Sequence, residues 1–273
     1  MVDPFDRELI VTHTIGNPML THADIQSALA RGSVSFDALQ RLYLRLPSTR
    51  CECESPGICC RFMPEMTLIE ALQWIDVLSG MPEDRRVTLM RRFVLFYLVT
   101  PLQQPGCPFL EEGGCSIYLQ RPFACRAYGL WSATIGKAKT RQHRDGKKAL
   151  IHKWRDLGIQ VPAGAVAFEM DYCTRVYGDA DPPLTDGAIM AVLSEVYALD
   201  EPLGHWRDVF EEHYHSDFSY LLMATLFGAR KSVLAKIAVI KEIAEMGTER
   251  RLQKFVSQVG DRALVEVFDK SGG

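Results

Sequence analysis

The segments CECESPGICCR (residues 51–61), CPFL (107–110), CSIY (115–118) and RPFACR (121–126) contain seven of the eight cysteines, and Cys173 is the eighth. They lie in turns rich in Gly, Pro and Ser, where no helix fixes the direction of a side chain. Cysteines used only as small apolar residues would be scattered along the chain. Because a thiolate is a soft ligand that suits zinc, iron–sulfur clusters and Cu(I), this grouping predicts a metal centre that stabilises the turns.

Every cysteine is a candidate metal ligand: Cys51, Cys53, Cys59, Cys60, Cys107, Cys115, Cys125 and Cys173. A four-iron cluster or a tetrahedral zinc ion takes four thiolates, so eight cysteines allow two sites, or one site and four spare thiols. Adjacent side chains diverge, so Cys59 and Cys60 are expected to serve different sites, unless one of them is a packed thiol. Cys51 and Cys53 are two positions apart and could share a cluster or a bridge.

The spacing of the cysteines favours iron over zinc. Structural zinc sites normally use paired Cys-x-x-Cys steps, whereas the gaps from Cys107 to Cys115 and Cys125 are longer and have prolines nearby. We therefore expect one or two iron–sulfur clusters of the 4Fe–4S type. Zinc is the first alternative, and redox-active or unliganded thiols are the second.

Three arginines stand beside cysteines and are candidate cofactor-binding residues: Arg61, Arg121 and Arg126. Four thiolates around a metal leave negative charge, which a guanidinium can offset while it donates hydrogen bonds to sulfur. The alternative is that Arg121 only caps a turn and that Arg126 pairs with a surface carboxylate.

The order of these blocks resembles the YkgJ-type cysteine-cluster family of zinc- or iron-chelating domains. The resemblance covers roughly residues 51–173 and implies a metal held by cysteines. Members of that family usually open with two Cys-x-x-Cys steps, whereas a single residue separates Cys51 from Cys53 here. A weaker similarity to flagellin lysine methylases, limited to the double-cysteine and CPFL blocks, implies a cluster-dependent enzyme as an alternative.

Composition describes an ordinary globular protein of 273 residues, with 47% apolar and 24% charged residues. A net charge of −3 gives no overall electrostatic case for nucleic acid or an anionic membrane. The longest apolar runs, 93–99 and 220–227, are far shorter than the ~20 residues of a membrane span. The start of the chain has no signal-peptide pattern, so we expect a cytoplasmic protein, whose thiols point to metal and not to disulfides.

Helical periodicity dominates the chain and predicts a mainly α fold, with an irregular cysteine-rich module packed against helices. Thr67 and Glu70 form a capping box, and Thr21 and Ser35 are candidate caps of earlier helices. Two helices, 67–80 and 82–99, are expected to form an antiparallel hairpin that brings Cys59 and Cys107 to the same end. The other expected helices are 21–31, 35–46, 116–119, 185–200, 206–213, 218–227, 232–246, 249–259 and 262–269.

The predicted organisation has three parts: an N-terminal helical segment (1–47), a cysteine-cluster module (48–178) and a C-terminal helical region (184–273). The C-terminal helices are one candidate surface for a protein partner. A basic stretch is another, although a solvated helix face is its alternative; its cations are Lys137, Lys139, Arg141, Arg144, Lys147, Lys148, Lys153 and Arg155. Its lone aromatic residue, Trp154, does not make a single-strand binding pattern, so nucleic acid is not expected.

The expected function is that of a cytoplasmic iron–sulfur protein whose cluster is structural or transfers electrons. The alternatives are a zinc-stabilised scaffold protein and a cluster-dependent enzyme, either methyltransferase-like or an oxidoreductase. No phosphate-binding glycine loop, dinucleotide fingerprint or nucleophile elbow is present, so no catalytic residue is identified.

Overall fold

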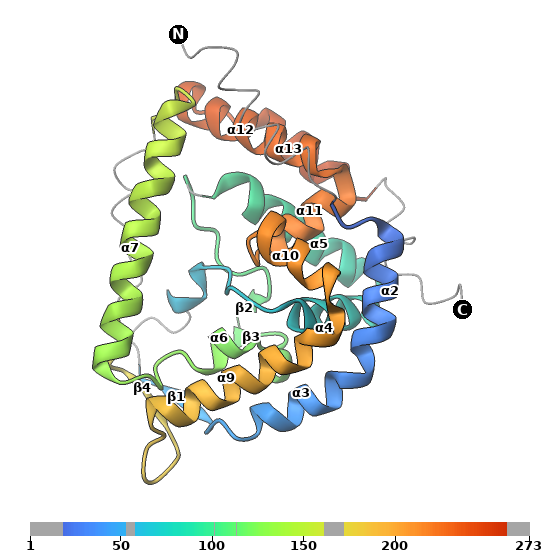
Figure 1. The fold of residues 1–273 in the computed structure, drawn as a ribbon. Helices are drawn as coiled ribbons and strands as arrows, with labels where there is room; N and C mark the ends of the chain where they lie inside the picture. Colours follow the sequence, from blue (N-terminus) through green and yellow to red (C-terminus); the bar gives the residue numbers. More distant parts are fainter. Residues whose placement is uncertain (1–18, 53–57, 101, 113, 161–171, 261–273) are drawn as a thin grey trace.

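The computed structural model describes residues 19–52, 58–100, 102–112, 114–160 and 172–260, and its fold is mainly α, as predicted (Figure 1). The α-helices are α2 (His22–Gly32), α3 (Phe36–Tyr43), α4 (Leu68–Ser79), α5 (Glu83–Val99), α6 (Phe123–Arg126), α7 (Ala133–Asp156), α9 (Asp186–Asp200), α10 (His205–Tyr214), α11 (Phe218–Phe227), α12 (Ala229–Met246) and α13 (Arg250–Ser257). The short 3₁₀ helices are η1 (Ser33–Ser35), η2 (Ile58–Arg61), η3 (Tyr118–Gln120) and η4 (Glu201–Leu203). Two antiparallel strand pairs complete the described chain: β1 (Thr49–Cys51) with β4 (Val176–Gly178), and β2 (Leu110–Glu111) with β3 (Gly114–Cys115).

Two of the three predicted N-terminal caps are present. Capping boxes start α2 at Thr21, with Asp24 as the returning carboxylate, and α4 at Thr67, with Glu70 in that role. Ser35 makes no capping hydrogen bond, so that prediction is wrong. The physical reason is that η1 runs directly into α3, which leaves no exposed helix start for the Ser35 hydroxyl to cap.

The turn between α4 and α5 does not build the expected hairpin packing. Residues 80–82 join the two helices, and Pro82 precedes the first turn of α5. In the structure, however, α4 packs mainly against α2 and α10, whereas α5 packs mainly against α11, α12 and α13. The two cysteine loops still meet, because the Cys107 N–H donates a hydrogen bond to the Cys60 carbonyl at 2.5 Å.

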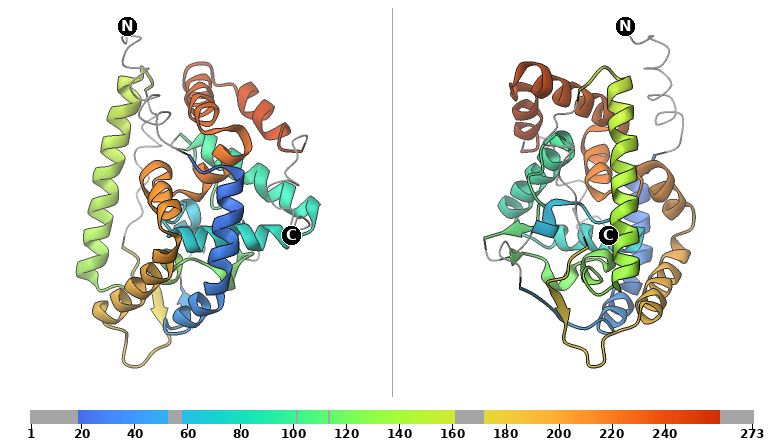
Figure 2. Two further views of the ribbon diagram at one scale, coloured as in Figure 1. Left: turned by 45° about the vertical axis from the view of Figure 1, so that its right-hand side comes forward. Right: turned by 90° about the vertical axis from the view of Figure 1, so that its left-hand side faces the viewer.

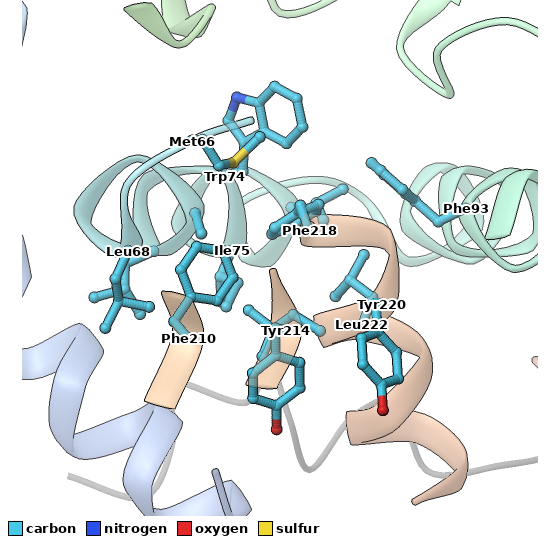
Figure 3. Packing of buried hydrophobic residues seen from close by; sticks show 14 of the residues in the cluster. Met66, Leu68, Trp74, Ile75, Phe93, Phe210, Tyr214, Phe218, Tyr220 and Leu222 are labelled. Atoms are coloured by element: carbon cyan, nitrogen blue, oxygen red, sulfur yellow. The ribbon is translucent and has the colours of Figure 1, made fainter. Parts of the chain in front are cut away.

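An aromatic cluster forms the centre of the core and joins segments that are distant in sequence. The Trp74 ring lies 4.9 Å from the Phe109 ring and 5.1 Å from the Phe218 ring, between centroids. The Phe93 ring lies 5.2 Å from each of the same two phenylalanines. Figure 3 shows Trp74, Phe93 and Phe218 meeting where α4, α5 and α11 converge. Phe109 belongs to the CPFL block, so the cysteine region shares this core.

The helices after residue 184 match the sequence-based predictions closely. Thr185 caps α9, and the Asp217 carboxylate caps α11 by accepting hydrogen bonds from Ser219 N and Tyr220 N. Their buried apolar residues, apart from Ile240 of α12, belong to the same cluster as those of α2 and α4. The three-part division of the chain stays a prediction, and the helix predicted at 262–269 lies outside the described residues.

Helix α7 runs along one side of the molecule, from the β1–β4 pair towards α12 (Figures 1 and 2). Near its start, Gly136 approaches Tyr172 so closely that an added Cβ would lie 2.0 Å from the ring. Near its end, Trp154 packs in a small separate cluster with Ile159 and Ile240. Most of the side chains between these two anchors are exposed to solvent.

The helices in the described part of the chain were compared with the requirements of a membrane span. None of the helices there combines the length and the apolar character that crossing a bilayer requires.

Candidate metal centre

Each cysteine block of residues 107–126 carries an apolar anchor two positions from its cysteine. Phe109 follows Cys107 and is fully buried; Ile117 follows Cys115 and is 2% exposed. Phe123 precedes Cys125, is 5% exposed and has its ring 6.2 Å from that of Trp131. Burying these side chains stabilises the irregular backbone, because apolar surface leaves water. The hydrophobic core therefore positions the thiols of these blocks.

Four thiols from these loops interact electrostatically, and we call them the cysteine group: Cys60, Cys107, Cys115 and Cys125. Cys107, Cys115 and Cys125 each act on the pKa of Cys60. The backbone ties the same residues together, since Cys107 N–H donates to Cys60 O and Leu110 pairs with Cys115 in the β2–β3 ladder. The η2 turn, the β2–β3 hairpin and α6 thus bring one or two thiols each to a common region.

Cys59 and Cys60 differ in spite of being neighbours. A hydrogen bond from the Cys59 thiol lowers the pKa of Cys60, against burial and the three other thiols of the cysteine group, which raise it. The same hydrogen bond raises the pKa of Cys59 far above its usual value. The two neighbouring thiols therefore differ in acidity, and the expectation that they serve different metal sites stays a prediction.

Burial keeps the other thiols of the cysteine group protonated at neutral pH. It raises the pKa of Cys107 to about 11, while the backbone N–H of Phe109 and the charge of Arg92 oppose it. It also raises the pKa of Cys115 and, more strongly, that of Cys125. Because metal ligation needs thiolates, binding of a cation here would release protons.

Guanidinium groups lie near the cysteine group, including one that the sequence did not single out. The charge of Arg121 lowers the pKa of Cys115 and Cys125. Arg92 of α5 acts in the same way on Cys107 and donates to the Leu110 carbonyl. No sequence signal could identify Arg92, because it lies on a helix fifteen positions before Cys107.

The candidate arginines Arg126 and Arg61 have different surroundings. The Arg126 guanidinium donates to the carbonyls of Leu119 and Arg121 and lies 4.4 Å from the centroid of the Tyr43 ring. Burial lowers the pKa of Arg126, and nearby Cys125 is among the groups that oppose this effect. Arg61 is exposed at the end of η2. A cofactor-binding role for Arg61, Arg121 or Arg126 stays a prediction.

Glu70 fixes the position of the helix that carries Cys125. Its buried carboxylate accepts hydrogen bonds from Thr67 N at 2.9 Å, from Phe123 N at 2.5 Å and from the Tyr43 hydroxyl. The sequence identified Glu70 only as the partner of Thr67. Its links to Tyr43 and Phe123 could not be foreseen, because nothing in the spacing places those residues beside α4.

Two of the other cysteines, Cys51 and Cys173, lie in or next to the β1–β4 strand pair. Cys51 is exposed on β1, opposite Val176 of β4. The Cys173 sulfur accepts a hydrogen bond from Arg175 N at 3.4 Å. Cys53 lies outside the described residues. All seven described cysteines are free thiols, so no disulfide joins any of them.

The chemical types of the groups in this region suit a thiophilic metal, because four thiols are accompanied by backbone N–H donors and nearby guanidinium groups. In the described part of the chain, no group of three or more His, Cys, Asp or Glu side chains has the geometry to hold a metal ion. The assignment of all eight cysteines as ligands therefore stays a prediction.

Comparison with known families supports metal binding by this region. Residues 52–148 match the family model CxxCxxCC, described as a "putative zinc- or iron-chelating domain". The match confirms the resemblance to the cysteine-cluster family over about a third of the chain, and it includes the whole cysteine group. The search of curated proteins found no significant match, and neither did the search of solved structures.

Proposed function

Starting from a segment that matches a zinc- or iron-chelating domain, we propose that this chain is a cytoplasmic iron–sulfur protein. Cys60, Cys107, Cys115 and Cys125 would supply the four thiolates of one 4Fe–4S cluster. The observation that carries this proposal is the family match over residues 52–148, which contain all four cysteines; the Cys107 N–H bond to Cys60 O and the pairing of Leu110 with Cys115 support it. A cluster bound there would crosslink three loops and supply one-electron transfer.

Iron is favoured over zinc by the spacing and by the surroundings of the sulfur atoms. The four thiols come from three loops and include no Cys-x-x-Cys pair, the step that structural zinc sites normally repeat. Backbone N–H groups of Phe109 and Ile117 stabilise the thiolates of Cys107 and Cys115. Hydrogen bonds to sulfur tune the potentials of iron–sulfur clusters.

The protein contributes charge balance and burial to this site. Arg121 and Arg92 favour the thiolate forms of the cysteine group, because a positive charge nearby stabilises an anion. Cys59 donates to Cys60 and remains outside the ligand set. The buried anchors Phe109 and Ile117 hold the loops of Cys107 and Cys115 against the core.

Metal analysis of protein purified without air tests the proposal. We expect iron and acid-labile sulfide together with a broad visible absorption. Single substitutions Cys60→Ser, Cys107→Ser, Cys115→Ser and Cys125→Ser should each strongly reduce the iron content. Cys51→Ser and Cys173→Ser serve as controls, and both should keep iron near the wild-type level. Circular dichroism should accompany each measurement, so that loss of iron is separated from loss of folding.

Zinc is the second candidate, since the description of the matching family names it beside iron. A colourless protein that carries stoichiometric zinc, and that loses it in the same four variants, would replace the iron–sulfur proposal with a zinc-stabilised scaffold. Equal iron loss in the control variants would overturn the assignment of Cys60 and its three partners.

A further inference from the structure

A groove between α12 and α13 presents an apolar floor to solvent. Its volume is about 880 Å³, and its floor is formed by Phe227, Leu234, Ala235, Ala238 and Phe255. Leu234 remains 44% exposed, although its neighbours Phe227 and Ala235 are buried. A large aliphatic side chain on the floor of a groove is thus left accessible to a ligand.

Four cations also line the groove: Arg230, Lys231, Arg251 and Lys254. The Lys231 ammonium lies over the floor itself, 5.5 Å from the centroid of the Phe227 ring and 5.7 Å from that of Phe255. No acidic side chain is among the described residues that line the groove. Arg251 has a carboxylate partner, Glu242, at 3.3 Å. Within the described part of the chain, Arg230 and Lys254 form no ion pair. The rim therefore has unbalanced positive charge in a protein whose net charge is −3.

The shape of the groove is that of a seat for a helix. Its α12 wall extends from Gly228 to Ala238, which at 1.5 Å per residue is about 15 Å, or close to three helical turns. On both walls the lining residues recur at helical spacing, so their side chains form ridges between which a third helix can pack. The Gln258 side-chain carbonyl is buried at this groove without a hydrogen-bond partner in the described chain.

We infer that this groove binds an amphipathic helix of a partner protein, with an apolar face flanked by acidic residues. The apolar face would cover Leu234 and Phe255, and the carboxylates would meet the cations on either side. Opposite charges at the rim give such an interface its orientation and its preference among partners. The inference is independent of the proposed metal centre, because no cysteine lines the groove.

Three designed peptides provide the probe. One peptide places Leu at positions i, i+3, i+4 and i+7 and Glu at the flanking positions; the second replaces each Glu with Lys, and the third is a shuffled version of the first. Fluorescence anisotropy with the full chain should show that the first peptide binds at least tenfold more tightly than either of the others. Equal binding of the Glu and Lys peptides would overturn the inference.

Matched variants locate the binding surface. Arg230→Glu with Lys254→Glu reverses two rim charges, and Lys137→Glu with Arg141→Glu makes the same charge change on exposed positions of α7. We expect the rim variant to weaken binding of the Glu peptide at least tenfold and the α7 variant to leave it near the wild-type level. Loss of binding in the α7 variant alone would assign the peptide to α7 and would contradict the groove.

The floor is tested in the same way. Leu234→Ser removes the exposed apolar anchor, whereas Val34→Ser changes an exposed apolar residue of η1 outside the groove. Only Leu234→Ser should weaken binding several-fold, with circular dichroism unchanged in both variants. Unaltered binding by Leu234→Ser would contradict an apolar contact with the peptide.

Discussion

At the scale of single residues, Glu70 connects the start of α4 with the helix that carries Cys125. We expect Glu70→Gln to lower the free energy of unfolding by about 1–3 kcal/mol, because the amide nitrogen cannot accept the hydrogen bonds that the carboxylate accepts. The altered position of α6 should also reduce the bound metal. Urea unfolding and metal analysis of the same preparation measure both effects.

A matched carboxylate provides the control for Glu70. Glu83 is exposed in the first turn of α5, where Glu83→Gln should change stability by no more than about 0.5 kcal/mol through the helix dipole. Equal losses in the two variants would show that charge alone, and not the buried hydrogen bonds of Glu70, accounts for the effect.

A second single residue, Asp200, makes the free energy of unfolding depend on pH. Burial raises the pKa of Asp200 to about 7, with smaller contributions from Glu70 and Glu211, although Ile69 N–H and Leu68 N–H donate to its carboxylate. A raised carboxyl pKa means that the folded state binds the proton more tightly than the unfolded state. The stability contributed by protonated Asp200 is therefore complete below about pH 4 and is lost as the pH rises to about 7.

Asp200→Asn tests this dependence. The asparagine stays neutral and can still accept a hydrogen bond at the start of α4. The variant should lack the decrease in unfolding free energy, of up to about 1.4 kcal/mol per pH unit, that Asp200 causes between about pH 4 and 7. Urea unfolding across this range, compared with exposed Asp84→Asn, measures the difference. If the unfolding free energies of the wild type and of Asp200→Asn changed with pH in parallel, the assignment of this pH dependence to Asp200 would be contradicted.

Sequence reasoning at the residue scale succeeded where partners are close along the chain. The predicted cap at Thr21 and the predicted capping box at Thr67 are both present, although the cap predicted at Ser35 is not. It missed Arg92 and the wider role of Glu70, because those contacts depend on tertiary packing that no local spacing encodes.

At the scale of elements, the two glycines inside α7 have opposite expected responses to alanine. Gly136 faces Tyr172 with no room for a Cβ, whereas a Cβ at Gly146 would meet nothing within 4 Å. Gly146→Ala should stabilise the protein by about 0.5–1 kcal/mol, since glycine is unfavourable in a helix. Gly136→Ala should destabilise it by about 1–3 kcal/mol through overpacking.

Thermal unfolding and limited trypsin digestion measure the two substitutions, because the exposed lysines and arginines of α7 report its detachment. Faster cleavage within α7 is expected for Gly136→Ala alone. Stabilisation by both substitutions would contradict the close contact between Gly136 and Tyr172.

Helix positions were largely predictable, since apolar periodicity and the breaks at Gly204, Gly228 and Gly247 are local signals. Helix α11 has the predicted bounds, 218–227. The packing partners of α4 and α5 were not predictable. A short turn between two helices suggests a hairpin, but here α4 packs mainly against α2 and α10, and α5 packs mainly against α11, α12 and α13.

At the scale of the whole molecule, the aromatic cluster predicts that loss of the metal destabilises the cysteine region and the C-terminal helices together. Phe109 of the cysteine region packs with Trp74 of α4 and Phe93 of α5, and both of these rings also pack with Phe218 of α11. Removal of the metal should therefore shift one cooperative unfolding transition. A metal contribution of about 4 kcal/mol would lower the melting temperature by about 10 °C.

Calorimetry of metal-loaded and metal-free protein measures this shift. Two separate transitions, of which only one moves, would instead support independent cysteine and C-terminal domains, as the sequence-based division at residues 178–184 predicted. The sequence could not decide this point, because the composition of a linker does not say whether the helices beyond it share a core with the helices before it.

The strand pairing of β1 with β4 has a consequence for synthesis on the ribosome. Cys125 completes the cysteine group about fifty residues before Gly178 emerges to close the β1–β4 ladder. At translation rates of about 5–20 residues per second, the four thiols are therefore synthesised roughly 3–10 s before this ladder can form. Loading of the proposed iron in this interval would precede closure of the ladder, and oxidants that reach the nascent chain would compete with it.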